Sequence, residues 1–151
     1  MTIYFYSARE KPYGCFSNFS PHGIEIDGLY YRTSEHYFQS MKFLGSPDDM
    51  EAVRQARTPK QAASIGRDRS RPLRPDWEEV KDDVMRRAVL AKFETHADIR
   101  EILLATGDAL IVENAPKDRY WGSGADGTGK NMLGIILMET RTILSEQDEL
   151  T

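Results

Sequence analysis

Residues 33–43 read TSEHYFQSMKF and carry the clearest helix signal in the first half of the chain. At the start of this stretch, Thr33 or Ser34 can cap a helix by accepting a hydrogen bond from a backbone N–H group. Glu35 then falls in the first turn, where the helix dipole favours a negative charge. We therefore predict a helix here and place the other elements around it.

One side of this predicted helix is polar. At about 100° per residue, Glu35, Gln39 and Lys42 fall within a stripe roughly 60° wide. The opposite side carries the apolar residues that should pack: Tyr37, Phe38, Met41 and Leu44. The stripe is either an ordinary solvated face or a reaction centre, in which a carboxylate transfers protons and a desolvated lysine attacks a sugar carbon.

Signals on both sides of this stretch predict a mostly helical α+β fold with a few short strands. Residues 2–6 and 109–113 read as strands, and Asp27-Gly28 predicts a tight hairpin within residues 24–31. Capping residues and prolines predict further helices that begin near Ser46, Thr58, Asp76, Asp98 and Asn131, the last one ending near Leu144. The strands are too irregularly spaced for a βαβ array.

Length and charge restrict the class of protein. The 151 residues suffice for a single domain with its own core, expected over about residues 3–145. With 20 Lys and Arg against 24 Asp and Glu, the net charge is −4, which argues against duplex DNA but not against a small phosphorylated ligand. Because Cys15 is the single cysteine and no signal peptide or long apolar run is present, we expect a soluble cytoplasmic protein without membrane contact.

A glycine-rich loop at residues 121–131, WGSGADGTGKN, is the second candidate site. It fits G-x-x-x-x-G-K, but Asn131 stands where a P-loop needs Ser or Thr for magnesium, which counts against a phosphotransferase. The backbone at Gly122 and Gly124, together with Lys130, can hold a phosphate or a carboxylate. Alternatively, the loop simply caps the following helix.

Aromatic and basic residues supply further candidates. Trp77 and Trp121 lie where the chain turns, and each is either a core anchor or a platform for a nucleobase. One segment contains four arginines, which form either a solvated surface or a phosphate-binding site: Arg67, Arg69, Arg71 and Arg74. The three histidines are scattered and Cys15 has no paired thiol, so we expect no metal site.

The chain resembles the NADAR domain family, the YbiA-like N-glycosidases, in six segments that occur in the family's order between about Tyr6 and Leu144. They are FSNF (16–19), TSEHYFQSMKF (33–43), IGR (65–67), RPDWEEVKDDVMRRAVLAKF (74–93), LLATGDALIVE (103–113) and DRYWGSGADGTGKNMLG (118–134). The resemblance implies a mostly helical α+β fold and a hydrolase that cleaves the N-glycosidic bond between ribose and a nitrogenous base, without a metal or other cofactor.

The resemblance implies two substrate classes. One comprises phosphoribosylated pyrimidine intermediates of riboflavin synthesis, and the other is ADP-ribose attached to guanine in nucleic acid. The partner is then a small ribose-phosphate nucleoside derivative or an ADP-ribosylated nucleic acid. A non-catalytic module that binds ADP-ribose or another nucleotide is the alternative.

If the chain is an N-glycosidase of this family, as the resemblance implies, each candidate residue has an expected role. Glu35 stabilises the oxocarbenium-like sugar or activates water. Lys42 stabilises charge or forms a transient imine with the opened ribose, and Asp126 is the second acid. The expected substrate-binding residues are Asn18, Gln39, Arg67, Trp77, Trp121, Gly122, Gly124, Lys130 and Asn131.

Overall fold

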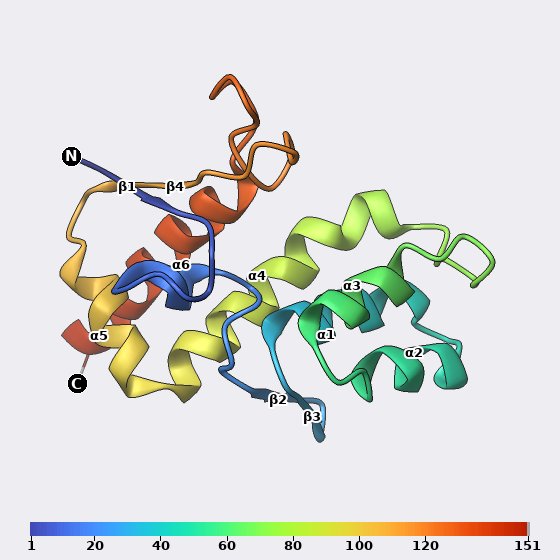
Figure 1. Cartoon of the computed structure of the whole chain (residues 1–151). Coiled ribbons are helices and arrows are strands. Elements are labelled where there is room, and N and C mark those ends of the chain that lie inside the picture. Colours follow the sequence, from blue (N-terminus) through green and yellow to red (C-terminus); the bar gives the residue numbers. More distant parts are fainter. Residues whose placement is uncertain (151) are drawn as a thin grey trace. The chain divides into compact units, whose positions relative to one another are not determined.

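The computed structural model describes residues 1–150 and groups the chain into two compact units. One unit joins residues 1–20 to the chain from residue 93 onward, and the other comprises residues 21–92. The described residues form six α-helices and two small two-stranded sheets (Figure 1). The expected fold class, mostly helical α+β with a few short strands, is confirmed, whereas a single domain over the whole chain stays a prediction.

A tight hairpin begins the unit of residues 21–92. Strands β2 (Ile24–Ile26) and β3 (Leu29–Tyr31) pair antiparallel. The two residues between them have positive φ angles, 54° at Asp27 and 81° at Gly28. Such angles are typical of the mirror-image turns that match the twist of a two-residue hairpin. The predicted hairpin is therefore confirmed.

Three short helices follow the hairpin and pack against one another. They are α1 (Ser34–Ser40), which continues as a 3-10 turn over Met41–Phe43, α2 (Pro47–Arg54) and α3 (Pro59–Gly66). Thr33 caps α1 and Thr58 caps α3, each by accepting a hydrogen bond from the backbone N–H three residues on. Their shared core contains Phe43, Val53, Ala56 and Ala62.

Helix α4 (Trp77–Thr95) begins directly after Asp76, the predicted capping residue, but the Asp76 side chain has another partner. The Asp76 carboxylate accepts two hydrogen bonds from the Arg74 guanidinium, at 2.6 and 3.0 Å. A charged donor competes better for a carboxylate than a backbone N–H does. The start of α4 is thus held by an ion pair with the preceding loop.

The other unit contains a two-stranded parallel sheet covered by a helix. Strand β1 (Thr2–Phe5) pairs with β4 (Leu110–Glu113), with Thr2 opposite Leu110. Helix α6 (Met132–Glu149) packs on β4 so closely that a Cβ atom at Gly134 would lie 2.1 Å from the carbonyl oxygen of Ile111. Helix α5 (Ala97–Ala105) completes this unit. Within residues 1–150, no helix combines the length and the apolar character needed to cross a membrane.

Asn131 joins β4 to α6. Its Oδ1 atom accepts a hydrogen bond from the N–H of Glu113, and its Nδ2 atom donates one to the carbonyl of Ile111, both at 2.9 Å. Its φ angle of 53° is in the left-handed region, which asparagine tolerates better than most residues. The side-chain amide that we expected at a ligand is thus bonded to the strand backbone.

Some predicted boundaries differ from the structure. Helix α6 extends to Glu149, beyond the predicted end at Leu144, and Gln147 near its end donates a hydrogen bond to Glu94. Leu44, predicted to pack with α1, is 52% exposed. The reason is that α1 gives way to a tighter 3-10 turn before Leu44, so the residue leaves the packed face.

His36 is fully buried in the first turn of α1. Its Nε2 atom lies 2.9 Å from the carbonyl oxygen of Ala56, and its Nδ1 atom lies 2.8 Å from Oγ1 of Thr33. A carbonyl oxygen can only accept, so we assign the proton to Nε2 and let Nδ1 accept from the hydroxyl. Burial lowers the pKa of His36 below its ordinary value of 6.5.

This environment predicts an acid-sensitive fold. As the pH falls, the unfolded chain takes up a proton at His36 before the folded chain does, so the free energy of unfolding decreases. The decrease should begin near the ordinary pKa and continue down to the lower pKa of the folded state. Thermal unfolding between about pH 8 and pH 5 measures it, and His36→Gln should reduce the slope. An unchanged slope in this variant would contradict the prediction.

Candidate functional site

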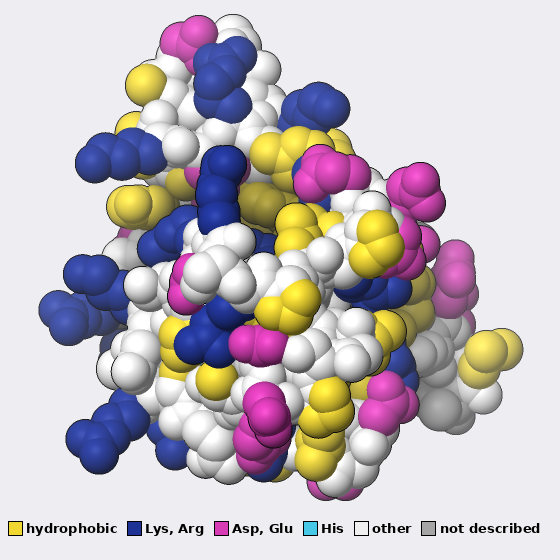
Figure 2. Space-filling model, turned by 90° about the vertical axis from the view of Figure 1, so that its right-hand side faces the viewer, with side chains coloured by type: hydrophobic (Ala, Val, Ile, Leu, Met, Phe, Trp, Pro, Cys, Tyr) yellow, Lys and Arg dark blue, Asp and Glu magenta, His cyan; other side chains and the backbone are white. Residues whose placement is uncertain are grey.

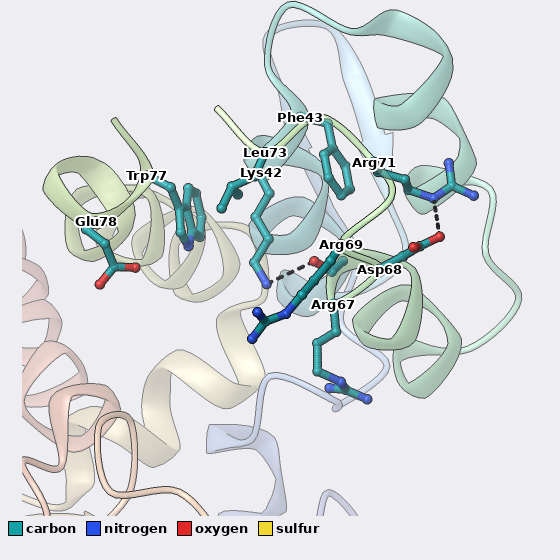
Figure 3. Close-up of a pocket in the computed structure, with 10 residues that line it drawn as sticks. Lys42, Phe43, Arg67, Asp68, Arg69, Arg71, Leu73, Trp77 and Glu78 are labelled. Atoms are coloured by element: carbon teal, nitrogen blue, oxygen red, sulfur yellow. Dashed lines mark hydrogen bonds and ion pairs between the residues drawn. The ribbon is translucent and has the colours of Figure 1, made fainter. Parts of the chain in front are cut away.

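A cavity of about 670 Å³ opens in the unit of residues 21–92. Its wall includes Lys42 from the 3-10 turn, Gly66 from the end of α3, Arg67 and Arg69 from the following loop, and Trp77 from the start of α4. In Figure 3, Lys42 lies between the Trp77 ring on one side and the arginine loop on the other. The structure therefore brings side chains from three separate sequence motifs to one pocket.

The polar stripe of α1 is buried. Every residue of the helix is buried, with Glu35 only 9% and Gln39 only 6% exposed. Nε2 of Gln39 donates a hydrogen bond of 2.6 Å to Oε2 of Glu35. This burial excludes an ordinary solvated face. Because removing a carboxylate from water costs considerable free energy, Glu35 needs hydrogen-bond donors such as Gln39.

Lys42 extends this stripe to the cavity wall. Its Nζ atom donates a hydrogen bond of 3.3 Å to the carbonyl oxygen of Gly66 and lies 5.9 Å from the centroid of the Trp77 ring. Burial lowers the pKa of Lys42 below 10.5, while the charge of Glu35 acts in the opposite direction. The lower pKa increases the fraction of neutral amine, which is the nucleophilic form.

Trp77 is both a core anchor and a wall of the cavity. The side chain is 6% exposed, and its ring packs edge-on against Phe38 with 5.0 Å between the centroids. The two interpretations left open by the sequence are thus compatible. A rigidly held indole in a pocket wall can stack on a nucleobase without first losing conformational freedom.

The four arginines divide into two pairs. Arg71 contacts Asp49 at 2.8 Å and Arg74 contacts Asp76, so these two hold the loop to its neighbours. Arg67 and Arg69 are exposed, line the cavity and form no ion pair within residues 1–150. Figure 2 shows Lys and Arg gathered mainly on the left of one face, so the net charge of −4 conceals local basic surface. Arg67 and Arg69 are therefore available to bind an anion.

Asp126 lies in the other unit, within the glycine-rich loop. Its Oδ1 atom accepts hydrogen bonds from the backbone and hydroxyl of Thr128 and from Arg119. These donors lower the pKa of Asp126 to about 2. At neutral pH the side chain is ionised, so it can stabilise positive charge but has no proton to give.

The remaining candidates also belong to this second unit. Asn18 is buried, Trp121 is half-buried with its ring edge-on to Tyr120, and Lys130 is exposed with its amine 5.3 Å from the Tyr120 ring centroid. Among the loop glycines, Gly122 and Gly124 are buried. In a P-loop the glycine-rich segment directly follows a strand. Strand β4 ends at Glu113, well before Gly124, so this loop differs from a P-loop in that respect as well. The ligand-binding roles of these residues stay predictions.

Two residues of the unit of residues 21–92 have structural positions that the sequence motifs did not indicate. In the sequence, Gly66 is part of the IGR segment and has no predicted role of its own in the site, whereas in the structure its carbonyl oxygen accepts a hydrogen bond from the Lys42 amine. Lys92 is 1% exposed and lies on the buried face of α4, where Met85 and Val89 precede it at helical spacing. A lysine at an apolar position of the periodicity was an available signal for a buried charge.

Within residues 1–150, no three or more His, Cys, Asp or Glu side chains are grouped so that they could hold a metal ion.

The sequence pattern of the NADAR domain matches residues 4–145. The chain belongs to the NADAR domain family. This NADAR protein is 57% identical over 143 residues to an N-glycosidase of Nostoc punctiforme, a match that covers 93% of this chain and 91% of the relative. It is 52% identical over 143 residues to the N-glycosidase YbiA of Escherichia coli, covering 95% and 88%.

The NMR structure of E. coli YbiA matches the fold of this NADAR protein with a TM-score of 0.88 and 50% identity, over 98% of this chain and 89% of that chain. A third relative is the chloroplastic riboflavin biosynthesis protein PYRR of Zea mays, 41% identical over 144 residues. That match covers 86% of this chain but 23% of the maize protein. The family expected from the sequence motifs is confirmed.

Proposed function

We propose that this NADAR protein hydrolyses the N-glycosidic bond between a ribose phosphate and a nitrogenous base, in the cavity lined by Lys42, Arg67 and Trp77. One observation carries the proposal: the Glu35–Gln39–Lys42 stripe is buried and ends at an amine of lowered pKa in the cavity wall. The identity to two relatives named N-glycosidase supports the reaction class.

Glu35 is the proposed electrostatic or general-base catalyst. Cleavage of an N-glycosidic bond develops positive charge on the ribose ring, as in other glycoside hydrolyses. A carboxylate in a site shielded from water stabilises such charge more strongly than one in bulk solvent. Glu35 either faces the developing charge directly or removes a proton from the attacking water.

Lys42 has two routes by which to assist. As a cation it stabilises negative charge on the departing base. As a neutral amine it attacks C1′ while the bond to the base breaks and the base leaves with the amine proton. Opening of the ring then gives an imine between Lys42 and C1′ and a hydroxyl at the former ring oxygen. Water adds to the imine and releases the sugar and the amine.

Substrate binding is assigned to the rest of the cavity wall. The Trp77 ring offers a stacking surface for the base. The exposed guanidinium groups of Arg67 and Arg69 in the cavity wall suit a phosphate, which arginine binds through charge-assisted hydrogen bonds.

The proposed substrates are phosphoribosylated pyrimidine intermediates of riboflavin synthesis, and the second candidate is ADP-ribose on guanine in nucleic acid. The name of the maize relative supports the first. Arg67 and Arg69 suit both, since each substrate carries phosphate on ribose. The buried thiol of Cys15 supports the proposed location in the reducing cytoplasm.

Incubation with candidate substrates tests this function. The wild-type chain is mixed in parallel with the phosphoribosylated aminouracil intermediate, its dephosphorylated form and DNA carrying ADP-ribosylated guanine, and mass spectrometry detects free base or unmodified guanine. We expect release from a phosphorylated substrate and much slower release from the dephosphorylated one. Tight binding in calorimetry without any release would contradict the proposal and favour the non-catalytic module.

Glu35→Gln should abolish base release and preserve the fold. The amide keeps the shape and can still accept from Gln39, but it removes the negative charge. We expect the rate to fall on the order of 100- to 10,000-fold, measured by base release alongside circular dichroism. Glu79→Gln, the same change at an exposed position of α4, is the matched control. Full activity in Glu35→Gln would exclude Glu35 as the catalyst.

Lys42 can be tested for the imine. Borohydride added during turnover should reduce the imine and leave the sugar attached to Lys42, visible as a mass increase on the peptide that contains it. Because burial lowers the pKa of Lys42, labelling should increase with pH through that lowered value as the neutral amine forms. The absence of an adduct under turnover conditions would leave Lys42 the electrostatic role alone.

A further inference from the structure

Gly66, the last residue of α3, is in contact with two members of the polar stripe. A Cβ atom built on Gly66 would lie 1.9 Å from Oε1, 2.7 Å from Cδ and 3.1 Å from Cβ of Gln39. The carbonyl oxygen of Gly66 accepts the hydrogen bond from Nζ of Lys42. One backbone position thus touches both the amide that is bonded to Glu35 and the amine in the cavity wall.

The position of the Gln39 amide follows from its partner. Nε2 of Gln39 donates to Oε2 of Glu35, so the amide oxygen of Gln39 faces away from that carboxylate. The oxygen is directed at Gly66, where it is buried and has no hydrogen-bond partner within residues 1–150. The amide can therefore adopt this orientation only if residue 66 has no side chain.

Backbone conformation does not account for the glycine. The positive-φ glycines of residues 1–150 are at other positions, so Gly66 has an angle that any residue can adopt. Glycine within a helix is less favourable than alanine by about 1 kcal/mol. Space for Gln39 is the property that only glycine supplies here.

We infer that Gly66 is a positioning residue for the two proposed catalytic groups. Its bare Cα atom lets Gln39 hold the Glu35 carboxylate, and its carbonyl oxygen holds the Lys42 amine. The inference rests on the proposed function, because it assigns Gly66 and Gln39 roles in orienting Glu35 and Lys42. Gln39, expected from the sequence to bind substrate, becomes a positioning residue as well.

Gly66→Ala, Gln39→Ala and the double variant test the inference. In Gly66→Ala the added methyl group displaces the Gln39 amide, and we expect kcat to fall on the order of 100-fold while KM changes little. Gln39→Ala should show a similar loss. The double variant should lose no more than Gln39→Ala alone, because the 1.9 and 2.7 Å contacts are then absent and Cβ of residue 39 needs to move only slightly.

Ser64→Ala, at an exposed position of the same helix, is the matched control and should keep wild-type kcat. The inference would be overturned by wild-type kcat in Gly66→Ala or by losses that add in the double variant. It would also be overturned if Gln39→Ala raised KM and left kcat unchanged. If Gly66→Ala does not fold, a folded double variant with the activity of Gln39→Ala supports it, and an unfolded double variant overturns it. A wild-type chain that releases no base would overturn the proposed function first and the inference with it.

Discussion

The hydrogen bond between Gln39 and Glu35 is the constraint on which the arrangement of the site depends. A carboxylate that is 9% exposed must have donors nearby, and at 2.6 Å the Gln39 amide is one of them. The bond fixes the direction of the amide, and the amide excludes a side chain at Gly66. The end of α3 can then approach α1 closely enough for its last carbonyl oxygen to accept from Lys42.

Burial changes the meaning of the charges in this unit. On a solvated helix face, an acid and an amine seven residues apart would only support the helix, and their interaction would be largely screened. Removed from water, Glu35 opposes the desolvation that lowers the pKa of Lys42. The outcome is an amine that is easier to deprotonate than an ordinary lysine yet lies near a negative charge. That combination suits a group that must alternate between cation and nucleophile.

Local signals predicted the elements of the fold well, because each was decided within a few residues. Thr33 and Thr58 cap their helices through hydrogen bonds to the backbone three residues on, which do not depend on how the helices pack. The hairpin turn is likewise formed by the positive φ angles of Asp27 and Gly28 themselves. The difference at Asp76 arose because a charged neighbour competes for a side chain that the sequence pattern assigns to a helix cap. The Asp76 carboxylate bonds to the Arg74 guanidinium, two residues before it, rather than capping α4. The Asn131 amide bonds to the backbone of β4, and its predicted role at a ligand stays a prediction. Burial of the α1 stripe depends on tertiary packing, so helical periodicity alone left both interpretations open.

Two glycines illustrate the same limit. In the sequence, Gly66 resembles a helix stop and Gly134 resembles a weak point inside a helix, yet both are explained by an oxygen atom from elsewhere in the chain. At Gly134 that atom is the carbonyl of Ile111, and the close approach joins α6 to β4. At Gly66 it is the side-chain oxygen of Gln39, and the close approach orients Glu35. A glycine whose backbone angles any residue could adopt therefore indicates a neighbour that needs the space, and the neighbour decides whether its role is packing or catalysis.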